Sequence, residues 1–202
     1  DRRQRQMCIR DRYGNGKYRI VLVDCGCKYN IVRCLTKRNA TVIRVPWDYD
    51  FTQIDYDGVM LSNGPGDPQQ CGATIANIRK AIALGKPIFG ICLGNQLLSI
   101  AAGATTFKLK YGHRSHNQPA LMVGTDRAVI TSQNHGFAVD TTTLDEGWEP
   151  YFVNLNDGTS EGIRHRTKPF FSVQFHPEAS GGPVDTEFLF DDFIQNIEKC
   201  RK

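Results

Sequence analysis

Cys92 stands between two glycines, Gly90 and Gly94, at a point where the residue pattern changes. The short apolar stretch 87–89 before it is typical of a buried strand, and apolar residues recur with helical spacing over 97–101. A tight strand-to-helix turn lifts one side chain above the sheet, and glycines avoid Cβ clashes there. The following helix N-terminus favours the thiolate, the form of cysteine that attacks carbonyl carbon. The pattern predicts a nucleophile, with a small buried cysteine as the alternative.

A cysteine nucleophile needs a base, and His176 is the first candidate. It follows an apolar segment, which predicts a place at the carboxyl end of a strand, where open α/β sheets bind ligands. Glu178 lies two residues on, and residues i and i+2 of an extended chain project to the same side. Glu178 can then hold one imidazole nitrogen while the other faces Cys92, as in a catalytic triad. A turn histidine is the alternative, and His135, without a carboxylate at short spacing, is the second candidate for the base.

The segment "LSNGPGDP" (61–68) provides a third feature of the same chemistry. Acyl transfer passes through an oxyanion, which backbone N–H groups usually receive. Gly64 and Gly66 leave the backbone open to a substrate, and the N–H of Leu93, one residue past the nucleophile, is the natural second donor. Taken alone, the segment is equally consistent with a Gly-Pro β-turn.

Strands and helices alternate along the first half of the sequence. The predicted order is strand 18–26, helix 30–39, strand 40–47, a strand running into a turn at 56–68, helix 71–85, and a strand followed by a helix over 87–103. This order predicts an α/β fold with an open, mostly parallel sheet and helices on both faces. From Thr105 to Phe175, short β-like pieces predict an additional small antiparallel β region and a return to the main sheet. An amphipathic helix at 185–199 closes the fold.

Composition is that of one globular domain. Of the 202 residues, 40% are hydrophobic and 23% charged, and no apolar run is long enough to span a membrane. The seven cysteines show neither a paired framework nor metal-ligand spacing, so free thiols in the cytoplasm and no metal site are predicted. Residues 18–202 are expected to form one domain. Residues 1–17 lack periodicity and are predicted to be a disordered lead-in or a cloning or assembly artefact.

The net charge of +4 belongs to the N-terminal tail. Residues 1–19 hold seven Lys/Arg and two Asp, while the rest of the chain carries one more acidic than basic residue. A basic arm can bind phosphate backbones, but no aromatic-interleaved patch or recognition helix follows it. Neither nucleic acid nor a membrane is therefore expected as a partner.

Three motifs together resemble the class I (triad) glutamine amidotransferases: "SNGPGDP" (62–68), "GICLGNQ" (90–96) and "FHPEA" (175–179). "KYGHRSHNQP" (110–119), "TSQNHGFAVD" (131–140) and the segment 175–193 narrow the resemblance to the small subunits of carbamoyl-phosphate synthases. It extends from about Tyr18 to Lys199. The segment "VIRVPWDYDF" (42–51) and Gly94–Gln96 look similar to bacterial members.

The resemblance implies a role for each matching residue. Cys92 attacks the side-chain amide of L-glutamine and forms a glutamyl thioester, His176 acts as base and then acid, and Glu178 orients it. The implied oxyanion donors are Gly64 and Leu93. The implied glutamine-binding positions are Gly66, Gln96, Asn134, Gly136 and Phe137. Ammonia then passes to a synthetase large subunit that makes carbamoyl phosphate for pyrimidine and arginine biosynthesis. No cofactor is implied for this chain, and ATP and Mg²⁺ are expected on the large subunit.

Two departures from the family pattern qualify these roles. Family small subunits carry an N-terminal domain before the amidotransferase part, and this sequence starts almost at the latter, which implies a fragment with weak activity. Asn95 stands where many members have His, a change that leaves the triad intact.

Several alternatives stay open at this point. The chain could be another class I amidotransferase, such as an anthranilate or GMP synthase component, although the segments 133–140 and 181–193 argue against it. A non-catalytic docking subunit is a second alternative, in which Cys92, His176 or Glu178 would be expected to be replaced. Asn134 and Phe137 also fit a turn between strands with the ring in the core.

Overall fold

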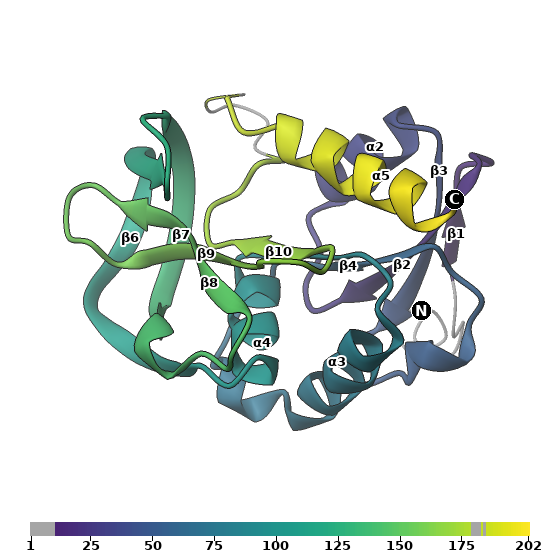
Figure 1. Cartoon of the computed structure of the whole chain (residues 1–202), viewed down its shortest axis with the longest axis horizontal. Helices are drawn as coiled ribbons and strands as arrows, with labels where there is room; N and C mark the ends of the chain where they lie inside the picture. Colours follow the sequence, from purple (N-terminus) through teal and green to yellow (C-terminus); the bar gives the residue numbers. More distant parts are fainter. Residues whose placement is uncertain (1–10, 179–182, 184) are drawn as a thin grey trace, which may run out of the picture.

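A single ten-stranded sheet organises the computed structural model, which describes residues 11–178, 183 and 185–202 (Figure 1). The strand order is β1-β3-β2-β4-β5-β10-β9-β8-β6-β7. Five central strands are parallel: β3 (Ala40–Pro46), β2 (Tyr18–Asp24), β4 (Gly58–Leu61), β5 (Ile88–Ile91) and β10 (Phe170–Val173). The antiparallel strands are β1 (Asp11–Tyr13), β9 (Ser160–His165), β8 (Trp148–Asn154), β6 (Thr105–Met122) and β7 (Ala128–Asp140).

Two helices cover each face of the parallel strands (Figure 1). On one face lie α2 (Tyr29–Lys37) and α5 (Phe188–Cys200), and on the other α3 (Gly72–Leu84) and α4 (Leu93–Ala101). Short 3-10 turns occur at Phe51–Gln53, Pro68–Gln70 and Thr141–Thr143. The predicted α/β architecture, with helices on both faces, is confirmed.

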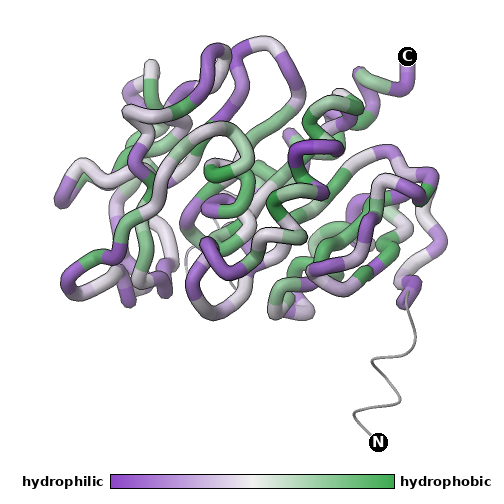
Figure 2. Tube along the Cα trace, turned by 90° about the horizontal axis from the view of Figure 1, so that it is seen from below, coloured by the Kyte–Doolittle hydropathy of each residue, from purple (hydrophilic) through white to green (hydrophobic). Residues whose placement is uncertain are grey.

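The central strands form where the sequence is apolar without alternation. All four residues of β4, of β5 and of β10 are buried, as expected for strands covered on both faces. Figure 2 shows the hydrophobic residues along the inner strands and helices, with hydrophilic residues at many loops and at the C-terminal end. None of the helices in the described part of the chain is long and apolar enough to cross a membrane.

The antiparallel region differs from the prediction in strand length. β6 has 18 residues and β7 has 13, so the segment 131–140 lies within a strand and is not a turn. β9 was not predicted, because Ser160–His165 carries Gly162 and little apolar alternation. The predicted return to the main sheet is confirmed, since β10 pairs in parallel with β5. α5 begins at Phe188, three residues later than predicted, after a turn at 185–187 whose Glu187 binds Arg38.

The prediction of a disordered lead-in is wrong for residues 11–17. Asp11–Tyr13 forms β1, which pairs with β3, and Asp11 makes an ion pair with Arg44. The Tyr13 ring packs edge-on against Tyr29, with centroids 5.7 Å apart. These contacts hold the segment in place although its sequence has no hydrophobic periodicity. Residues 1–10 lie outside the described residues.

Candidate active site

The turn between β5 and α4 places Cys92 in a strained backbone conformation. Its φ of 53° and ψ of −102° lie where side chains other than glycine are rare, at a cost of about 1–3 kcal/mol. Its N–H donates to the carbonyl of Val173 at 2.9 Å, which ties the turn to β10. A Cβ on Gly94 would lie 2.3 Å from the carbonyl oxygen of Leu61. The predicted sharp turn is therefore present, and Gly94 is required by the carbonyl of another strand.

His176 reaches the same edge of the sheet from β10. β10 and β5 are parallel neighbours, with Val173 opposite Ile91, so the residues that follow both strands emerge together. Nδ1 of His176 lies 2.7 Å from Oε1 of Glu178, and the Glu178 side chain is fully buried. The His176 N–H donates to the carbonyl of Ser132 on β7 at 2.9 Å. Because Nδ1 is occupied by Glu178, Nε2 is the nitrogen available to Cys92.

The imidazole of His176 is held in its charged form. Burial lowers its pKa, but the interaction with the Cys92 sulfur and the hydrogen bond with Glu178 outweigh burial and raise the pKa to about 9. At neutral pH the imidazolium thus stands beside the sulfur. This is the charge arrangement that stabilises a cysteine thiolate.

A cavity of about 460 Å³ opens at Cys92. Eight of the predicted site residues line it: Gly64, Gly66, Cys92, Gln96, Asn134, Gly136, Phe137 and His176. Leu93 and Glu178 are not in this lining. Both are buried, Leu93 at the start of α4 directly after Cys92 and Glu178 in contact with Nδ1 of His176. The structure thus brings eight of the ten predicted residues together around one cavity.

Five further residues line the cavity without having been predicted: Lys28, Asn63, Pro65, Arg114 and His135. The sequence predicts His135 only as the second candidate, after His176, for the base that activates Cys92. Its Nδ1 lies 2.7 Å from the carbonyl oxygen of Phe137 and its Nε2 2.9 Å from Oε1 of Gln133. With both ring nitrogens engaged, His135 is not the base. Asn63, Pro65 and His135 lie next to predicted positions in the quoted motifs. Arg114 lies in the motif 110–119, in which no site residue was predicted, and Lys28 lies in none of the motifs.

Gly64 is a glycine for a different reason from the one predicted. A Cβ there would lie 2.1 Å from the carbonyl oxygen of Cys25, so the close approach of two loops excludes any other residue. Gly66 has a φ of 101°, and an added Cβ would meet no atom within 4 Å, so this is the residue that leaves the backbone open. The turn after β4 therefore sits tightly on the loop after β2.

The β7 wall of the cavity is held by side-chain contacts. The carbonyl of Phe137 accepts from Nε2 of Gln96 at 3.1 Å in addition to its contact with Nδ1 of His135. Asn134 is exposed and Phe137 only half-buried, both within a strand. The alternative of a turn with Phe137 in the core is thus wrong.

Asn95 is accommodated by a buried polar network behind α4. Its Nδ2 donates to Oε1 of Gln174 at 3.0 Å, and its Oδ1 accepts from the Ser172 hydroxyl at 2.8 Å. Nε2 of Gln96 donates to the same Gln174 oxygen at 3.1 Å. The residue that departs from the family pattern is therefore fully engaged and connects α4 to β10.

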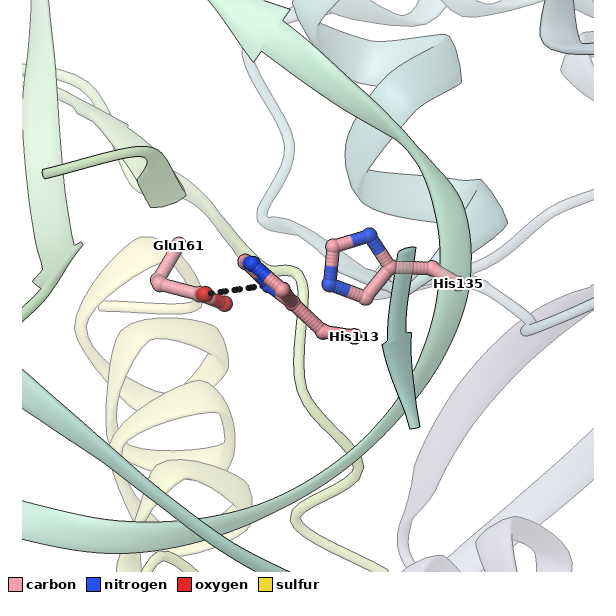
Figure 3. Close-up of side chains that lie close together, drawn as sticks. All are labelled: His113, His135 and Glu161. Atoms are coloured by element: carbon pink, nitrogen blue, oxygen red, sulfur yellow. Dashed lines mark ion pairs between the residues drawn. The ribbon is translucent and has the colours of Figure 1, made fainter. Parts of the chain in front are cut away.

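One group of side chains in the described residues has the composition of a metal site. Ligand atoms of His113, His135 and Glu161 lie within 4.8 Å of one another (Figure 3). The imidazole nitrogens are already engaged, His113 with Asp157, Gln133 and Glu161, and His135 as described above. A metal would have to displace these contacts, so the group is better described as a hydrogen-bonded ion-pair cluster.

Comparison with known families agrees with this geometry. The family described as "Glutamine amidotransferase class-I" matches residues 21–196. The chain belongs to this family. The amidotransferase is 53% identical over 195 residues to the "Carbamoyl phosphate synthase arginine-specific small chain" of Debaryomyces hansenii, covering 95% of this chain and 45% of that protein. It is 56% identical over 183 residues to the "Multifunctional protein pyr-3" of Neurospora crassa, covering 90% and 10% respectively.

The amidotransferase thus spans about half the length of the small chains it matches and 10% of the multifunctional protein. These relatives come from Debaryomyces hansenii and Neurospora crassa and give no support to the resemblance to bacterial members. The solved structure of a putative GMP synthase subunit from Thermoplasma acidophilum has the same fold, with a TM-score of 0.79 at 23% identity, covering 94% of this chain and 98% of that one.

Proposed function

We propose that this amidotransferase is the glutaminase part of a glutamine-dependent carbamoyl-phosphate synthase. The observation that carries the proposal is that Cys92, on a strained turn, and His176, held by Glu178, face one cavity from adjacent parallel strands. The name of the similar protein from Debaryomyces hansenii supports the choice of this synthase among the amidotransferases.

The first half of the reaction releases ammonia. The Cys92 thiolate attacks the side-chain amide carbon of L-glutamine, and the carbonyl π electrons move to oxygen. The N–H groups of Gly64 and Leu93 are the donors proposed for this oxyanion. The oxyanion then re-forms the carbonyl and expels the amide nitrogen, to which the His176 imidazolium gives its proton. The products are ammonia and a glutamyl thioester on Cys92.

The second half regenerates the enzyme. His176, now neutral, takes a proton from a water molecule while that water attacks the thioester carbon. Collapse of the second oxyanion expels the Cys92 thiolate and leaves glutamate. Glu178 accepts the Nδ1–H of His176 throughout, which fixes the ring and stabilises its charged form.

The substrate is proposed to lie along the β7 wall. Gln96, Asn134 and the backbone of Gly136 and Phe137 offer donors and acceptors for the polar ends of glutamine, and Gly66 keeps the opposite side open. The cavity volume of about 460 Å³ is within the usual range for a small-molecule site.

The partner proposed for this chain is the synthetase large subunit, which receives the ammonia for carbamoyl phosphate synthesis in the arginine and pyrimidine branches. ATP and Mg²⁺ are assigned to that partner, and no cofactor to this chain. The cytoplasm is the proposed compartment, and the six cysteines among the described residues, all free thiols, are consistent with a reducing environment.

A glutaminase assay tests the proposal. Ammonia release from L-glutamine is measured for the chain alone, with a purified carbamoyl-phosphate synthase large subunit, and after iodoacetamide treatment, with Cys92→Ala as the matched control. We expect slow release alone, faster release with the large subunit, and none after alkylation or in Cys92→Ala. A rate of ammonia release that does not change when the large subunit is added would favour another class I amidotransferase. Equal background rates in the wild type and Cys92→Ala would favour a non-catalytic docking subunit.

A further inference from the structure

A buried ion pair lies behind the β7 wall of the proposed glutamine site. Nδ1 of His113 lies 3.4 Å from Oε1 of Glu161, and Nε2 of His113 lies 2.8 Å from Oδ2 of Asp157. Figure 3 shows the Glu161 carboxylate directed at the His113 ring. The Glu161 side chain is fully buried, whereas Asp157 is 42% exposed. The inner partner of His113 is therefore shielded from water, and the outer one is not.

This ion pair connects to the cavity through two side chains of β7. The amide oxygen of Gln133 lies 3.0 Å from Nδ1 of His113 and 2.9 Å from Nε2 of His135. His135 in turn lies 2.7 Å from the Phe137 carbonyl through Nδ1, and its ring packs edge-on against His113 at 4.9 Å. A continuous series of contacts thus leads from β9 to the wall that faces Cys92.

The backbone pairing of β7 with β6 is irregular at Gly136. Among the described residues β7 is the last strand of the sheet, with β6 as its one paired strand and a further backbone bond from the His176 N–H to Ser132. Between the pairs Lys108–Phe137 and His113–His135, β6 advances by five residues and β7 by only two. Regular cross-strand hydrogen bonds are interrupted at such an irregularity. Backbone pairs continue on both sides, at His135 and Phe137, but Gly136 has no β6 partner in the register. Side-chain contacts therefore add to the backbone pairing in positioning the stretch that contains Gly136.

We infer that the His113–Glu161 ion pair positions the β7 segment 133–137 for glutamine binding. The inference rests on the proposed function and adds positioning residues to it. Neither His113 nor Glu161 lines the glutamine cavity, so both act through Gln133 and His135. Their loss should alter the affinity for glutamine and leave the chemistry at Cys92 largely unchanged.

Charge explains why the pair is effective. The contact with the Glu161 carboxylate is the largest influence on His113, and although burial opposes it, Asp157 adds to it, so the pKa of His113 is raised to about 9. Asn154 donates to Oε1 of Glu161 at 2.8 Å, while Oε2 has no hydrogen-bond partner among the described residues. Removing the imidazolium would leave the buried carboxylate poorly compensated, and the neighbouring strand would rearrange.

Steady-state glutaminase kinetics of His113→Asn and Glu161→Gln, in the chain saturated with a purified large subunit, test this inference. We expect the KM for glutamine to rise about tenfold in each variant with kcat within about twofold, the pattern of lost ground-state and transition-state binding. Asp157→Asn is the matched control. It removes the exposed partner of the same imidazole, so its KM should stay within about twofold of wild type.

A double variant separates a shared contact from two unrelated defects. If both residues act through one ion pair, KM in His113→Asn/Glu161→Gln should resemble that of either single variant rather than rise about a hundredfold. The double variant also removes the buried charge together with its partner, which keeps the test informative if a single variant folds poorly. Protection of Cys92 from iodoacetamide by glutamine measures how fully substrate or thioester occupies the site, independently of the rate of ammonia release.

Two results would overturn the inference. One is an unchanged KM and unchanged glutamine protection in folded variants. The other is a fall in kcat as large as the rise in KM, together with slower alkylation of Cys92 in the absence of glutamine, which would mean general damage to the site. Failure of the proposed function itself looks different, because the wild type would then release no ammonia and glutamine would not protect its Cys92.

Discussion

The two walls of the cavity are built by different means. On the parallel-sheet wall, backbone meets backbone: a Cβ on Gly94 would lie 2.3 Å from one carbonyl oxygen, and one on Gly64 would lie 2.1 Å from another. On the β7 wall, a Cβ on Gly136 would meet nothing within 4 Å. There the Phe137 carbonyl is held by the side chains of Gln96 and His135.

This difference follows from what each wall has to hold. Cys92 adopts an unfavourable backbone conformation, and such strain persists only where close packing excludes other arrangements. A binding wall carries no comparable strain, and polar side-chain contacts are sufficient to place its groups. Changes on the first wall should therefore affect chemistry or folding, and changes on the second should affect affinity.

His176→Asn is expected to have the largest effect. The variant keeps a polar side chain of similar size but loses the proton donor and acceptor of both half-reactions. kcat should fall by about ten-thousand-fold or more, as when a triad base is removed. Single-turnover ammonia release gives this number, and glutamine protection of Cys92 from alkylation should stay within about threefold of wild type. A variant with nearly normal kcat and weakened binding would mean that His176 contributes to glutamine affinity and not to the chemistry.

Gly94→Ala is expected to have the next largest effect, on folding. The added Cβ meets the carbonyl of Leu61, which belongs to β4 and has little room to move. Overpacking of this kind costs about 1–3 kcal/mol, and more where backbone must shift. Denaturant unfolding measures the loss of free energy. Gly72→Ala is the control, since nothing lies within 4 Å of its added Cβ and its unfolding free energy should change by less than about 1 kcal/mol.

The sequence was sufficient for the parallel-sheet wall because local patterns determine it. A glycine on each side of Cys92, an apolar strand before it and a helix after it fix the turn within seven residues of chain, 90–96. His176 and Glu178 follow another apolar strand, and parallel pairing of β10 with β5 brings the two sites together. The carboxyl ends of parallel strands lie along one edge of an open sheet, so Cys92 and His176 could be expected at the same edge, while their direct neighbourhood comes from the β10–β5 pairing.

The β7 wall could be predicted only through family resemblance. Asn134, Gly136 and Phe137 were placed by their motif, but the residue pattern predicts short pieces and turns where one long strand carries them. Its position depends on contacts between residues far apart in sequence, such as His113 with Glu161 and Gln96 with Phe137. Residue periodicity carries no information on such pairs. Lys28 was missed for the same reason, since its place beside Glu178 depends on two distant loops.

Glu178→Gln, on the parallel-sheet wall, is expected to change the pH dependence of kcat. The folded-state pKa of His176 is raised to about 9, with the charge and hydrogen bond of Glu178 among the causes. The imidazolium needed to protonate the leaving nitrogen is therefore present below about pH 9 and lost above it. Without the carboxylate the pKa falls, and the alkaline limb of kcat should move down by about one pH unit. A pH–kcat profile measures the shift, and an unmoved limb would show that Glu178 does not control His176.

Lys28→Met is expected to have the smallest effect. Nζ of Lys28 lies 3.5 Å from Oε1 of Glu178, but the Lys28 side chain is 51% exposed, so water and salt screen the pair. The methionine keeps the apolar stem, and kcat/KM for glutamine should change by less than about threefold, with the difference shrinking between low and high ionic strength. A tenfold rise in KM that persists in high salt would mean that Lys28, which also lines the cavity, contacts glutamine directly. Both walls would then share the binding of the substrate, and the division between chemistry and affinity would hold only for Cys92 and His176.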